Sequence, residues 1–495
     1  MTQTEVTDRV GTDASAYPLV VDMDETLVRT DVLHEALQRL LVARPMDVFG
    51  LIAPLRQGKA TFKAHVADRV IVPAQEVQIN PVVMALIHEA RACGRKVVLV
   101  SASEQRQVAA IAANLGVFDD AIGTGAQETG GENLSGAKKA AFLAGRYGVG
   151  QFDYVGDCAT DLPVWKSAHR AYVVRTSPAL AKQASTQGTA LIALEATPTN
   201  IDRARSLLRA LRPHQWLKNI LVFLPILAAQ NPGGLWAAAV AFVLFSLTAS
   251  SVYIINDLVD LSADRAHPRK SQRPFASGAV SIKAGVLMAM GLLVGSAVFS
   301  LWLMPSVFVA VLAAYFAVTV AYSFTLKRKL IVDVITLAGL YTMRIIAGAA
   351  AASIVPSPWL VAFSMFLFFG LAAIKRQAEL VDQAASGKEA VPGRGYLSSD
   401  VTVLQMMAIS SGQAAVMVFA LYLYSPAVAA LYDTPEIMWL VCPIMLYWLS
   451  RVAILTHRGF MTDDPIIFAV RDRISQVIGV LLVLILVAAE RDWAL

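Results

Sequence analysis

The chain has 495 residues, of which 56% are hydrophobic and 16% are charged, and its net charge at pH 7 is +5. Average globular proteins have roughly 45–50% apolar and about 25% charged residues, so this composition excludes a disordered chain and a simple soluble enzyme. The charge is also unevenly divided. Residues 1–200 hold 19 Lys/Arg and 21 Asp/Glu, whereas residues 201–495 hold 23 and 16. We therefore expect a soluble, slightly acidic domain followed by a basic and very apolar one.

The chain begins with a polar stretch, residues 1–16, that lacks the basic start and apolar core of a signal peptide. We expect this tail to be disordered. The three cysteines, Cys93, Cys158 and Cys442, are far apart and form no metal-binding spacing. This usage favours a reducing compartment over a disulfide framework.

Residues 17–195 contain short apolar runs that each end in polar residues. In chain order these are Asp22-x-Asp24-x-Thr26 after 19–21, Ser101 after 96–100, and Gly156-Asp157-x-x-x-Asp161 after 152–156. Lys138 and Lys139 open a helix before the last run. Strands that alternate with helices predict a parallel sheet whose site lies at the carboxyl ends of the strands.

The four motifs in this order resemble those of the haloacid dehalogenase superfamily of phosphatases. The resemblance implies an α/β domain over 17–195 with a Rossmann-type parallel sheet. It also implies that Asp22 is the nucleophile that forms an aspartyl-phosphate and that Asp24 is the general acid/base. The alternative is a degenerate, non-catalytic domain of the same fold.

The same resemblance implies residues that bind the phosphoryl group and a metal ion. Ser101 would hold the transferring phosphoryl group, and Lys138 or Lys139 would shield its charge, with Lys139 favoured. Mg²⁺ would be bound at the ends of the first and last strands. The implied metal-site residues are Asp22, Asp24 through its backbone carbonyl, Asp157 and, in support, Asp161.

Residues 31–90, between the first two motifs, have a mostly helical pattern and predict a small helical cap. Two interpretations of its apolar faces stay open. Either they only cover the active site, or the stretch MDVFGLIAPL (46–55) dips toward a membrane-bound substrate.

A linker and a short amphipathic helix are expected over 196–212. Ile201, Ala204, Leu208 and Leu211 share one helical face, and arginines occupy the rest. This pattern favours an interfacial helix on anionic lipid. A solvated, charged linker helix is the alternative.

Apolar runs of membrane-spanning length recur after this helix, and we expect nine spans in an all-α membrane domain over 213–495. The expected spans are 217–230, 235–255, 284–303, 305–324, 331–352, 358–375, 402–424, 436–455 and 474–490. Lys and Arg crowd alternate connections, which by the positive-inside rule face the cytoplasm. We therefore expect a protein of the cytoplasmic (inner) membrane whose N-terminal domain is cytoplasmic.

A polar motif, NDxxDxxxD, follows the second expected span. Its polar residues are Asn256, Asp257, Asp260 and Asp264. On a helix the three carboxylates share one face and repel each other unless a cation lies among them. Mg²⁺ prefers such oxygen ligands together with substrate phosphates, and Lys270 and Arg273 suit phosphate oxygens. The motif therefore predicts a Mg²⁺–diphosphate site at the cytoplasmic surface, with a solvated loop of mixed charge as the alternative.

This motif in a protein of nine expected spans resembles the UbiA-type intramembrane prenyltransferase superfamily. A closer likeness is to its polyprenyl-phosphate (decaprenyl-phosphate) phosphoribosyltransferase branch. The shared stretches are RPHQWLKN (212–219), NDLVDLSADRAHPRKSQRP (256–274), AYSFTLK (321–327), RIIAG (344–348), KRQAEL (375–380) and DDPIIFAVRDR (463–473). The resemblance implies that Asp257 and Asp260 are catalytic, that they bind Mg²⁺ with Asp264, and that Asn256 and Asp264 contact substrate.

One departure from the wider superfamily concerns its second acidic motif, after the sixth span. Here Lys375 and Arg376 stand where carboxylates are expected, followed by Glu379. Phosphoribosyl diphosphate (PRPP) and a lipid phosphate together carry more phosphate than a prenyl diphosphate, so extra cations are expected. Lys375 and Arg376 would bind phosphate, with Glu379 as a metal or ribose ligand. Juxtamembrane snorkelling is the alternative.

Further cations are candidates for substrate binding. Lys218 is expected to grip the lipid phosphate, and Lys327 lies in a basic connection. Arg344, inside the fifth span, needs a partner, either a substrate phosphate or Asp333, with Tyr322 and Tyr341 as expected neighbours. Four residues match the family without an assigned role: Asp463, Asp464, Arg471 and Arg473.

Together the two halves predict one bifunctional enzyme that uses Mg²⁺ in both domains. The membrane half would transfer 5-phosphoribosyl from PRPP to a polyprenyl phosphate, and the fused phosphatase would remove the 5-phosphate. The main alternative is transfer of a prenyl group from a prenyl diphosphate to a small acceptor, with an unrelated phosphatase activity. A membrane scaffold with a dead phosphatase domain is a third. No nucleic-acid partner is expected, and a homo-oligomer is possible.

Overall fold

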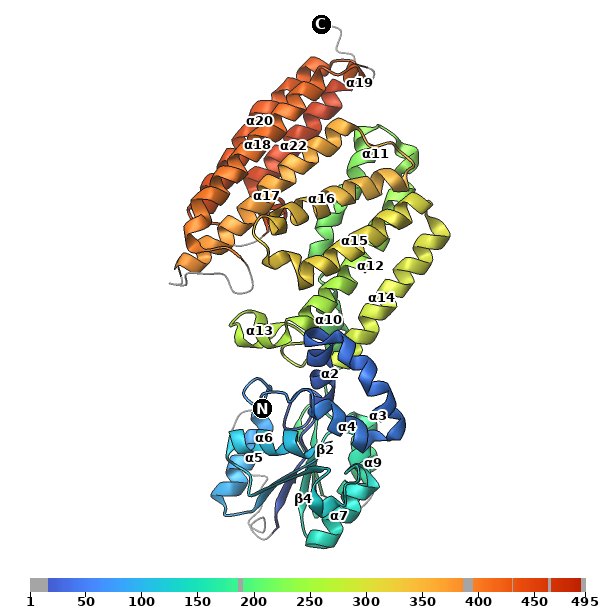
Figure 1. Cartoon of the computed structure of the whole chain (residues 1–495), viewed down its shortest axis with the longest axis vertical. Helices are drawn as coiled ribbons and strands as arrows, with labels where there is room; N and C mark the ends of the chain where they lie inside the picture. Colours follow the sequence, from blue (N-terminus) through green and yellow to red (C-terminus); the bar gives the residue numbers. More distant parts are fainter. Residues whose placement is uncertain (1–16, 186–189, 386–394, 430, 462–463, 491–495) are drawn as a thin grey trace. The chain divides into compact units, whose positions relative to one another are not determined.

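The computed structural model describes residues 17–185, 190–385, 395–429, 431–461 and 464–490 (Figure 1). The expected tail, residues 1–16, lies outside them. The chain divides into two compact units. The first comprises Met1–Leu211 with Ile254–Leu287, and the second comprises Arg212–Tyr253 with Met288–Leu495.

The first unit contains a six-stranded, fully parallel sheet, as the alternating pattern predicted. The strands are β1 (Leu19–Val21), β2 (Val97–Glu104), β3 (Asp120–Thr124), β4 (Asp153–Gly156), β5 (Arg170–Val174) and β6 (Ala190–Glu195). Their order is β3-β2-β1-β4-β5-β6, so the chain turns from one side of β1 to the other between β3 and β4. In open parallel sheets, ligands bind at this point, beyond the carboxyl ends of the strands.

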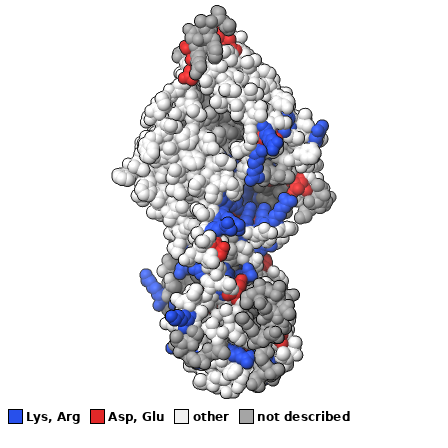
Figure 2. Space-filling view, turned by 180° about the vertical axis from the view of Figure 1, so that it is seen from behind, with Lys and Arg blue, Asp and Glu red and all other residues white. Residues whose placement is uncertain are grey.

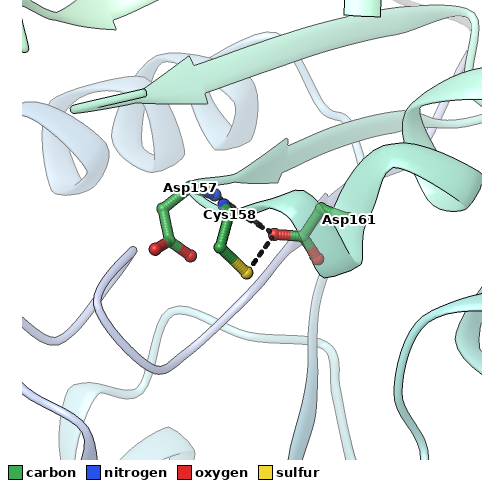
Figure 3. Close-up of side chains that lie close together, drawn as sticks. All are labelled: Asp157, Cys158 and Asp161. Atoms are coloured by element: carbon green, nitrogen blue, oxygen red, sulfur yellow. Dashed lines mark hydrogen bonds between the residues drawn. The ribbon is translucent and has the colours of Figure 1, made fainter. Parts of the chain in front are cut away.

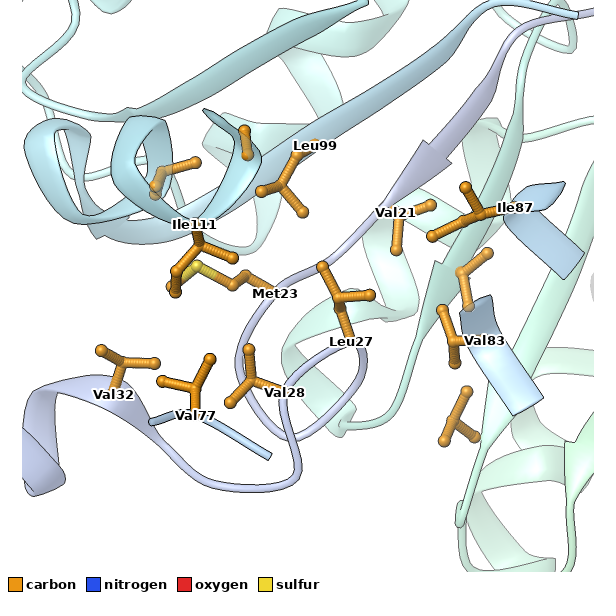
Figure 4. Close-up of a cluster of buried hydrophobic side chains, with 14 of the residues drawn as sticks. Val21, Met23, Leu27, Val28, Val32, Val77, Val83, Ile87, Leu99 and Ile111 are labelled. Carbon is orange, nitrogen blue, oxygen red and sulfur yellow. The ribbon is translucent and has the colours of Figure 1, made fainter. Parts of the chain in front are cut away.

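Helices cover both faces of the sheet, because its apolar residues alternate in direction along each strand. Val21 and Leu99 pack with α5 (Pro81–Ala92) and α6 (Gln105–Leu115) on one face (Figure 4). Val20 packs on the other face. The helices of that face are α7 (Ala137–Tyr147), α8 (Leu162–Ser167) and α9 (Pro178–Ser185).

The cap consists of short helices that follow β1. They are α2 (Val32–Ala43), the 3-10 segment η1 (Pro45–Leu51), α3 (Ile52–Gln57) and α4 (Lys59–Ala67). Asp31 begins α2 by accepting a hydrogen bond from the backbone N–H of His34. The cap is shorter than the predicted 31–90, because Val83 and Ile87 of α5 belong to the core of the sheet.

Residues 254–287, which carry the acidic motif, belong to the same unit. They contain the end of α12 (Leu235–Val259), then α13 (Leu261–Ala266) and the start of α14 (Ile282–Leu303). Arg265 of α13 donates to the fully buried Glu35 of α2 at 2.9 Å, and Gln38 donates to the carbonyl of Leu258 at 2.6 Å. The segment after α12 is therefore joined to the first cap helix by a buried ion pair.

The second unit is helical. Besides parts of α12 and α14, its longer helices are α15 (Ser306–Phe324), α16 (Val332–Ala351), α17 (Pro358–Ala385), α18 (Val401–Leu423), α20 (Val441–His457), α21 (Pro465–Arg471) and α22 (Arg473–Ala489). The unit also contains the 3-10 segments η4 (Pro213–Phe223) and η9 (Pro435–Leu440) and the short helices α11 (Leu224–Ala228) and α19 (Pro426–Ala429). Within the described ranges, seven helices are long and apolar enough to cross a membrane, or eight if α21 and α22, bent by 86°, form one span.

The predicted count of nine spans is not confirmed. The main difference is the first expected span, 217–230, where the chain instead forms η4 and α11. Pro213 and Pro225 each remove a backbone donor from a regular helix. Lys218 and Asn219, which are both buried, turn their polar groups into the protein instead of toward lipid. The amphipathic helix expected over 201–212 is present as α10 (Asn200–Leu211).

Packing in the second unit brings η4 into close contact with α16. A Cβ at Gly348 would lie 1.9 Å from the carbonyl oxygen of Val222, so a larger residue would push the two segments apart. The surface of this unit is mostly uncharged in the view of Figure 2, with Lys and Arg gathered in one region. This distribution is the one expected of helices that face lipid.

Candidate active sites

The first site is a pocket of about 180 Å³ beyond the carboxyl ends of β1, β2 and β4. The side chains that line it include Asp22, Asp24, Lys63, Lys139, Asp157 and Asp161. The predicted phosphatase residues of three separate motifs are thus brought together, as parallel strands with adjacent carboxyl ends require.

Two serines hold Asp24. The hydroxyls of Ser101 and Ser103 both donate to its Oδ2, at 3.1 and 2.6 Å, and the backbone N–H of Val32 donates to its Oδ1 at 2.9 Å. Ser101 was predicted, but Ser103 was not. Its position two residues along β2 directs its side chain to the same face, which was the available signal.

The structure distinguishes the two candidate lysines. Lys139 is buried and donates to Asp22 Oδ1 at 2.7 Å and to the hydroxyl of Tyr154 at 2.9 Å. Lys138 is exposed and pairs with Glu132. A helix places consecutive side chains about 100° apart, so only one of the pair can face the pocket.

Asp157 and Asp161 stand in different environments (Figure 3). The carboxylate of Asp157 accepts a hydrogen bond from Thr26 at 3.1 Å. Asp161 accepts from the backbone N–H groups of Asp157 and Cys158, at 3.2 and 3.3 Å, and from Tyr154 at 2.8 Å. Asp161 therefore holds the turn after β4 in shape, whereas Asp157 is the better placed of the two to bind a cation.

The pocket carries more negative than positive charge. Burial raises the pKa of Asp22 to about 7, although Lys139 opposes the rise. Burial, and then repulsion from Asp22, raises the pKa of Asp157 to about 8. Carboxylates that repel each other in a buried site are the donor set that a hard divalent cation stabilises, so these residues fit Mg²⁺.

A cap residue that sequence reasoning missed also lines the pocket. Lys63 of α4 donates to the carbonyl of Ala102 at 2.6 Å and to Asn133 Oδ1 at 2.9 Å. Burial lowers its pKa. It adds a second ammonium group beside the carboxylates of the pocket, and none of the four motifs includes it because it lies on a cap helix between the first two.

The acidic motif forms a second cluster in the first unit. Asp257 and Asp264 are both buried, and Arg273 Nη1 contacts them at 3.2 and 2.5 Å. Asp260 lies at the junction of α12 and α13, where the helical i→i−4 hydrogen bonds continue from Asn256 to Asp264. Lys270, which was expected to bind phosphate, is exposed in the described structure.

The oxygen donors of this motif also fit Mg²⁺. The side-chain carbonyl of Asn256 is buried without a hydrogen-bond partner in the described structure, one residue from Asp257. A buried acceptor without a donor costs free energy unless a ligand binds it. Together with two carboxylates it supplies the hard oxygen ligands that this ion requires.

A third cluster lies inside the second unit and was only partly predicted. Lys218 of η4 and Lys375 of α17 both contact Asp464, at 2.7 and 3.0 Å. Tyr341 of α16 donates to the same carboxylate at 3.1 Å. Asp464, which had no assigned role, is therefore the shared partner of both predicted phosphate-binding lysines; Asp463 lies outside the described residues.

Arg344 adjoins this cluster but has neutral partners. Its guanidinium donates to Asn219 Oδ1 at 2.8 Å, to the hydroxyl of Tyr315 at 3.0 Å and to the carbonyl of Leu340 at 2.5 Å. It also lies over the ring of Tyr341. The alternative of an ion pair with Asp333 is wrong, because Asp333 pairs with Arg376.

Arg376 belongs to a separate, enclosed network. It is 1% exposed and contacts Asp333 at 2.7 Å, Glu379, and the hydroxyl of Tyr322 at 2.9 Å. Lys375 and Arg376 therefore face different partners, and the structure does not favour Arg376 as a phosphate ligand or Glu379 as a metal ligand. Tyr322, expected beside Arg344, contacts Arg376 instead. Lys327 is half-buried in η7 (Leu326–Arg328).

Comparisons with known proteins agree with both resemblances. The UbiA prenyltransferase family matches residues 220–469, and haloacid dehalogenase-like hydrolases match residues 19–166. The uncharacterized protein y4nM of Sinorhizobium fredii is 35% identical over 474 residues, which cover 94% of this chain and 89% of that protein. A decaprenyl-phosphate phosphoribosyltransferase of Mycolicibacterium smegmatis is 35% identical over 286 residues, 55% of this chain and 88% of that protein.

Among solved structures, a UbiA homolog from Archaeoglobus fulgidus bound to GPP and Mg²⁺ is 16% identical, with a TM-score of 0.44 over 57% of this chain and 99% of that one. The long apolar helices and the family match identify a multi-pass membrane protein. The chain belongs to the UbiA prenyltransferase family and carries a haloacid dehalogenase-like domain at its N-terminal end.

Proposed function

We propose that this protein transfers a 5-phosphoribosyl group from PRPP to a polyprenyl phosphate and then removes the 5-phosphate with its fused phosphatase domain. The product is polyprenyl-phosphoryl-ribose. The basic connections support a site on the cytoplasmic side of the inner membrane. A relative of the membrane part, from Mycolicibacterium smegmatis, is named decaprenyl-phosphate phosphoribosyltransferase.

The observation that carries the transferase proposal is the surplus of positive charge among the described residues of the third cluster, in the second unit. Lys218 and Lys375 share Asp464, and Arg344 contacts neutral groups. Buried cations without matching carboxylates are costly, and an anion that binds among them removes the cost. A phosphate on the lipid acceptor or on PRPP supplies that charge, and its oxygens accept several charge-assisted hydrogen bonds.

The acidic motif supports a binding site for the diphosphate group of PRPP. Asp257, Asp264 and Asn256 would hold Mg²⁺, which when bound neutralises diphosphate and stabilises it as a leaving group. Arg273 already contacts both carboxylates. Its guanidinium can exchange one of them for a diphosphate oxygen, so that it binds the same ligand from the other side.

The transfer is a displacement at the anomeric carbon of the ribose. An oxygen of the lipid phosphate forms the new bond to C1, and the bond from C1 to the diphosphate oxygen breaks with its electron pair. The attacking oxygen is already anionic, so the protein need not remove a proton. Its task is to position two anions, and the cations reduce their repulsion.

The phosphatase step uses the first pocket. Asp22 Oδ attacks the phosphorus of the 5-phosphate, and the ester bond to the ribose oxygen breaks. Asp24, whose pKa burial raises, gives that oxygen its proton and then takes one from the water that hydrolyses the aspartyl-phosphate. Lys139 contacts Asp22 and balances charge on the transferring group, and Ser101 would turn its hydroxyl from Asp24 to that group. Asp22 and Asp157 would hold Mg²⁺.

Fusion of the two activities suits consecutive steps. A lipid-linked ribose 5-phosphate made by one part of a chain meets the other part at a raised effective concentration. The ester that the phosphatase cleaves is then the one that the transfer step leaves in place.

The test uses the full-length protein in lipid nanodiscs with polyprenyl phosphate, Mg²⁺ and PRPP that carries ¹⁴C in the ribose and ³²P in the 5-phosphate. We expect ¹⁴C in the lipid fraction, with ³²P released afterwards as inorganic phosphate. Absence of lipid-linked ¹⁴C would overturn the transferase proposal. A product that keeps its ³²P would overturn the phosphatase proposal, and product from a prenyl diphosphate and a small acceptor would support the rival reaction.

A further inference from the structure

The cap of the phosphatase domain exposes an unusual group of apolar side chains. Within one stretch at the end of α2 and in η1 and α3, four large apolar residues are more than half exposed: Leu41 at 51%, Met46 at 75%, Ile52 at 52% and Leu55 at 59%. Leu40 and Leu51, in the same stretch, are buried in the core of the unit. Single exposed apolar residues are ordinary, but four in fifteen consecutive positions form a patch.

Cations accompany these side chains. Arg44, Arg56 and Lys59 are all exposed, and Asp47 is the one acid between residues 41 and 60. The domain as a whole is slightly acidic, so the positive charge is local to this stretch. We name the four apolar residues and the three cations the cap patch. Apolar side chains mixed with Arg and Lys are typical of a surface that binds an anionic bilayer.

We propose that the cap patch inserts its apolar side chains into the surface of an anionic lipid bilayer. A bilayer is always available to the cap patch, because the same chain has seven described helices that are long and apolar enough to span one. Positive charge favours anionic lipid over a second copy of the chain, whose cap patch would be equally basic. Lipid headgroups can also hydrate the arginines while the acyl region takes up the apolar side chains.

The position of the cap patch gives this contact a consequence. The helices on either side of it, α2 and α4, contribute Leu33 and Lys63 to the wall of the phosphatase pocket. A bilayer contact through the cap patch would therefore hold the pocket wall at the lipid surface, where a lipid-linked ester is found. That consequence rests on the proposed phosphatase substrate, but the bilayer contact does not.

Val149 provides a matched control in the same domain. It is 71% exposed, like Met46, but it lies in the loop before β4, at the amino ends of the strands and so at the opposite edge of the sheet from the pocket. If exposure alone led to lipid contact, Val149 would make it as well.

The experiment places the full-length protein in nanodiscs that contain a phosphatidylglycerol with a photoactivatable diazirine in its acyl chain, and maps adducts by mass spectrometry. We expect adducts within residues 41–57 and none within 146–152, with the membrane helices as the positive control. Met46→Glu with Leu55→Glu should lower cap adducts by about tenfold, because two apolar side chains no longer enter the lipid. Val149→Glu should leave them unchanged.

Replacing phosphatidylglycerol by phosphatidylcholine should also lower cap labelling, since the three cations lose their anionic partners. Labelled membrane helices with an unlabelled cap would overturn the proposal, and so would a cap that crosslinks to a second copy instead of to lipid. Hydrolysis of a soluble phosphomonoester by the Met46→Glu, Leu55→Glu variant should be unchanged. A failed bilayer contact is thereby distinguished from a failed phosphatase assignment.

Discussion

Two buried charge clusters of this protein have opposite surpluses. The phosphatase pocket is lined by Asp22, Asp24 and Asp157, and Lys139 contacts Asp22. In the membrane unit, two lysines share Asp464 and an arginine lies beside them. The first surplus is negative and fits a metal ion, whereas the second is positive and fits a phosphate. The sign of a buried surplus thus indicates the class of ligand that completes a site.

A buried ion pair with equal and opposite charges, elsewhere in the chain, shows by contrast why a surplus of buried charge indicates a ligand. Arg95 and Asp153 are both almost fully buried and contact each other at 2.5 Å, one cation to one carboxylate. An ion pair of this kind needs no ligand and serves the fold. Unbalanced charge in an equally buried place destabilises the empty protein, so its presence points to a bound partner of opposite sign.

The strongest test of the phosphatase pocket is the variant Asp22→Asn. The amide keeps the size of the side chain but cannot attack phosphorus, so release of inorganic phosphate should fall by at least about 10⁴-fold. Transfer of the ribose group should continue, and the phosphorylated lipid should accumulate. Thin-layer separation of the ¹⁴C-labelled lipids measures both effects. Unchanged phosphate release would show that Asp22 is not the nucleophile.

The cluster of Lys218, Lys375 and Asp464 is tested by Lys218→Met, which keeps the approximate length of the side chain and removes its charge. Asp464 would keep Lys375, but the cluster would lose part of its attraction for phosphate. Transfer from PRPP should fall by about 10²–10³-fold, the usual effect of removing one charge-stabilising group. Lys329→Met, at an exposed position of the same unit, is the matched control and should change the rate little.

Phosphatase activity on a soluble phosphomonoester should be unaffected by Lys218→Met. If it fell in parallel with transfer, the variant would have lost its fold and not its ligand site. If transfer persisted at the rate of the Lys329→Met control, the positive surplus would not bind a reacting phosphate.

Much of the phosphatase site could be predicted from sequence because its carboxylates and Ser101 stand at the ends of short apolar runs. The carboxyl ends of parallel strands meet at one edge, so Asp22, Ser101 and Asp157 had to converge. The cation cluster could be predicted only in part. Lys218 and Lys375 were found as charges in an apolar context, but their common partner Asp464 is far from both in sequence.

The sequence-based predictions that the structure does not bear out have a common cause. An ion pair with Asp333 was one of two alternatives for Arg344, yet helix packing pairs Asp333 with Arg376 and gives Arg344 neutral partners. Hydropathy also predicted a span over 217–230, where prolines and buried polar groups accompany the 3-10 segment η4 and the short helix α11 instead. Periodicity indicates which face of a segment is apolar, but it does not indicate which neighbour that face meets.

The stability of the phosphatase pocket should depend on pH. In the metal-free pocket the pKa of Asp157 is raised to about 8 and that of Asp22 to about 7, against about 3.9 for an unfolded aspartate. Between these values the folded state binds more protons than the unfolded state, so the free energy of unfolding decreases as the pH rises through this window. Mg²⁺ favours the ionised carboxylates and competes with those protons.

It follows that Mg²⁺ should stabilise the phosphatase fold more at high pH than at low pH. Hydrogen exchange of peptides from β1 and β4, followed in the intact protein, reports this directly. The slowing of exchange by Mg²⁺ should be at least about tenfold greater at pH 8.5 than at pH 6, because protonated carboxyls must first lose a proton to bind the ion. Comparison with and without Mg²⁺ at each pH cancels the intrinsic pH dependence of exchange. Asp157→Asn should remove most of the difference, since it removes a carboxylate whose pKa is raised to about 8. A Mg²⁺ effect that is equal at the two pH values would mean that proton and metal ion do not share these carboxylates, and the negative surplus would then need another explanation.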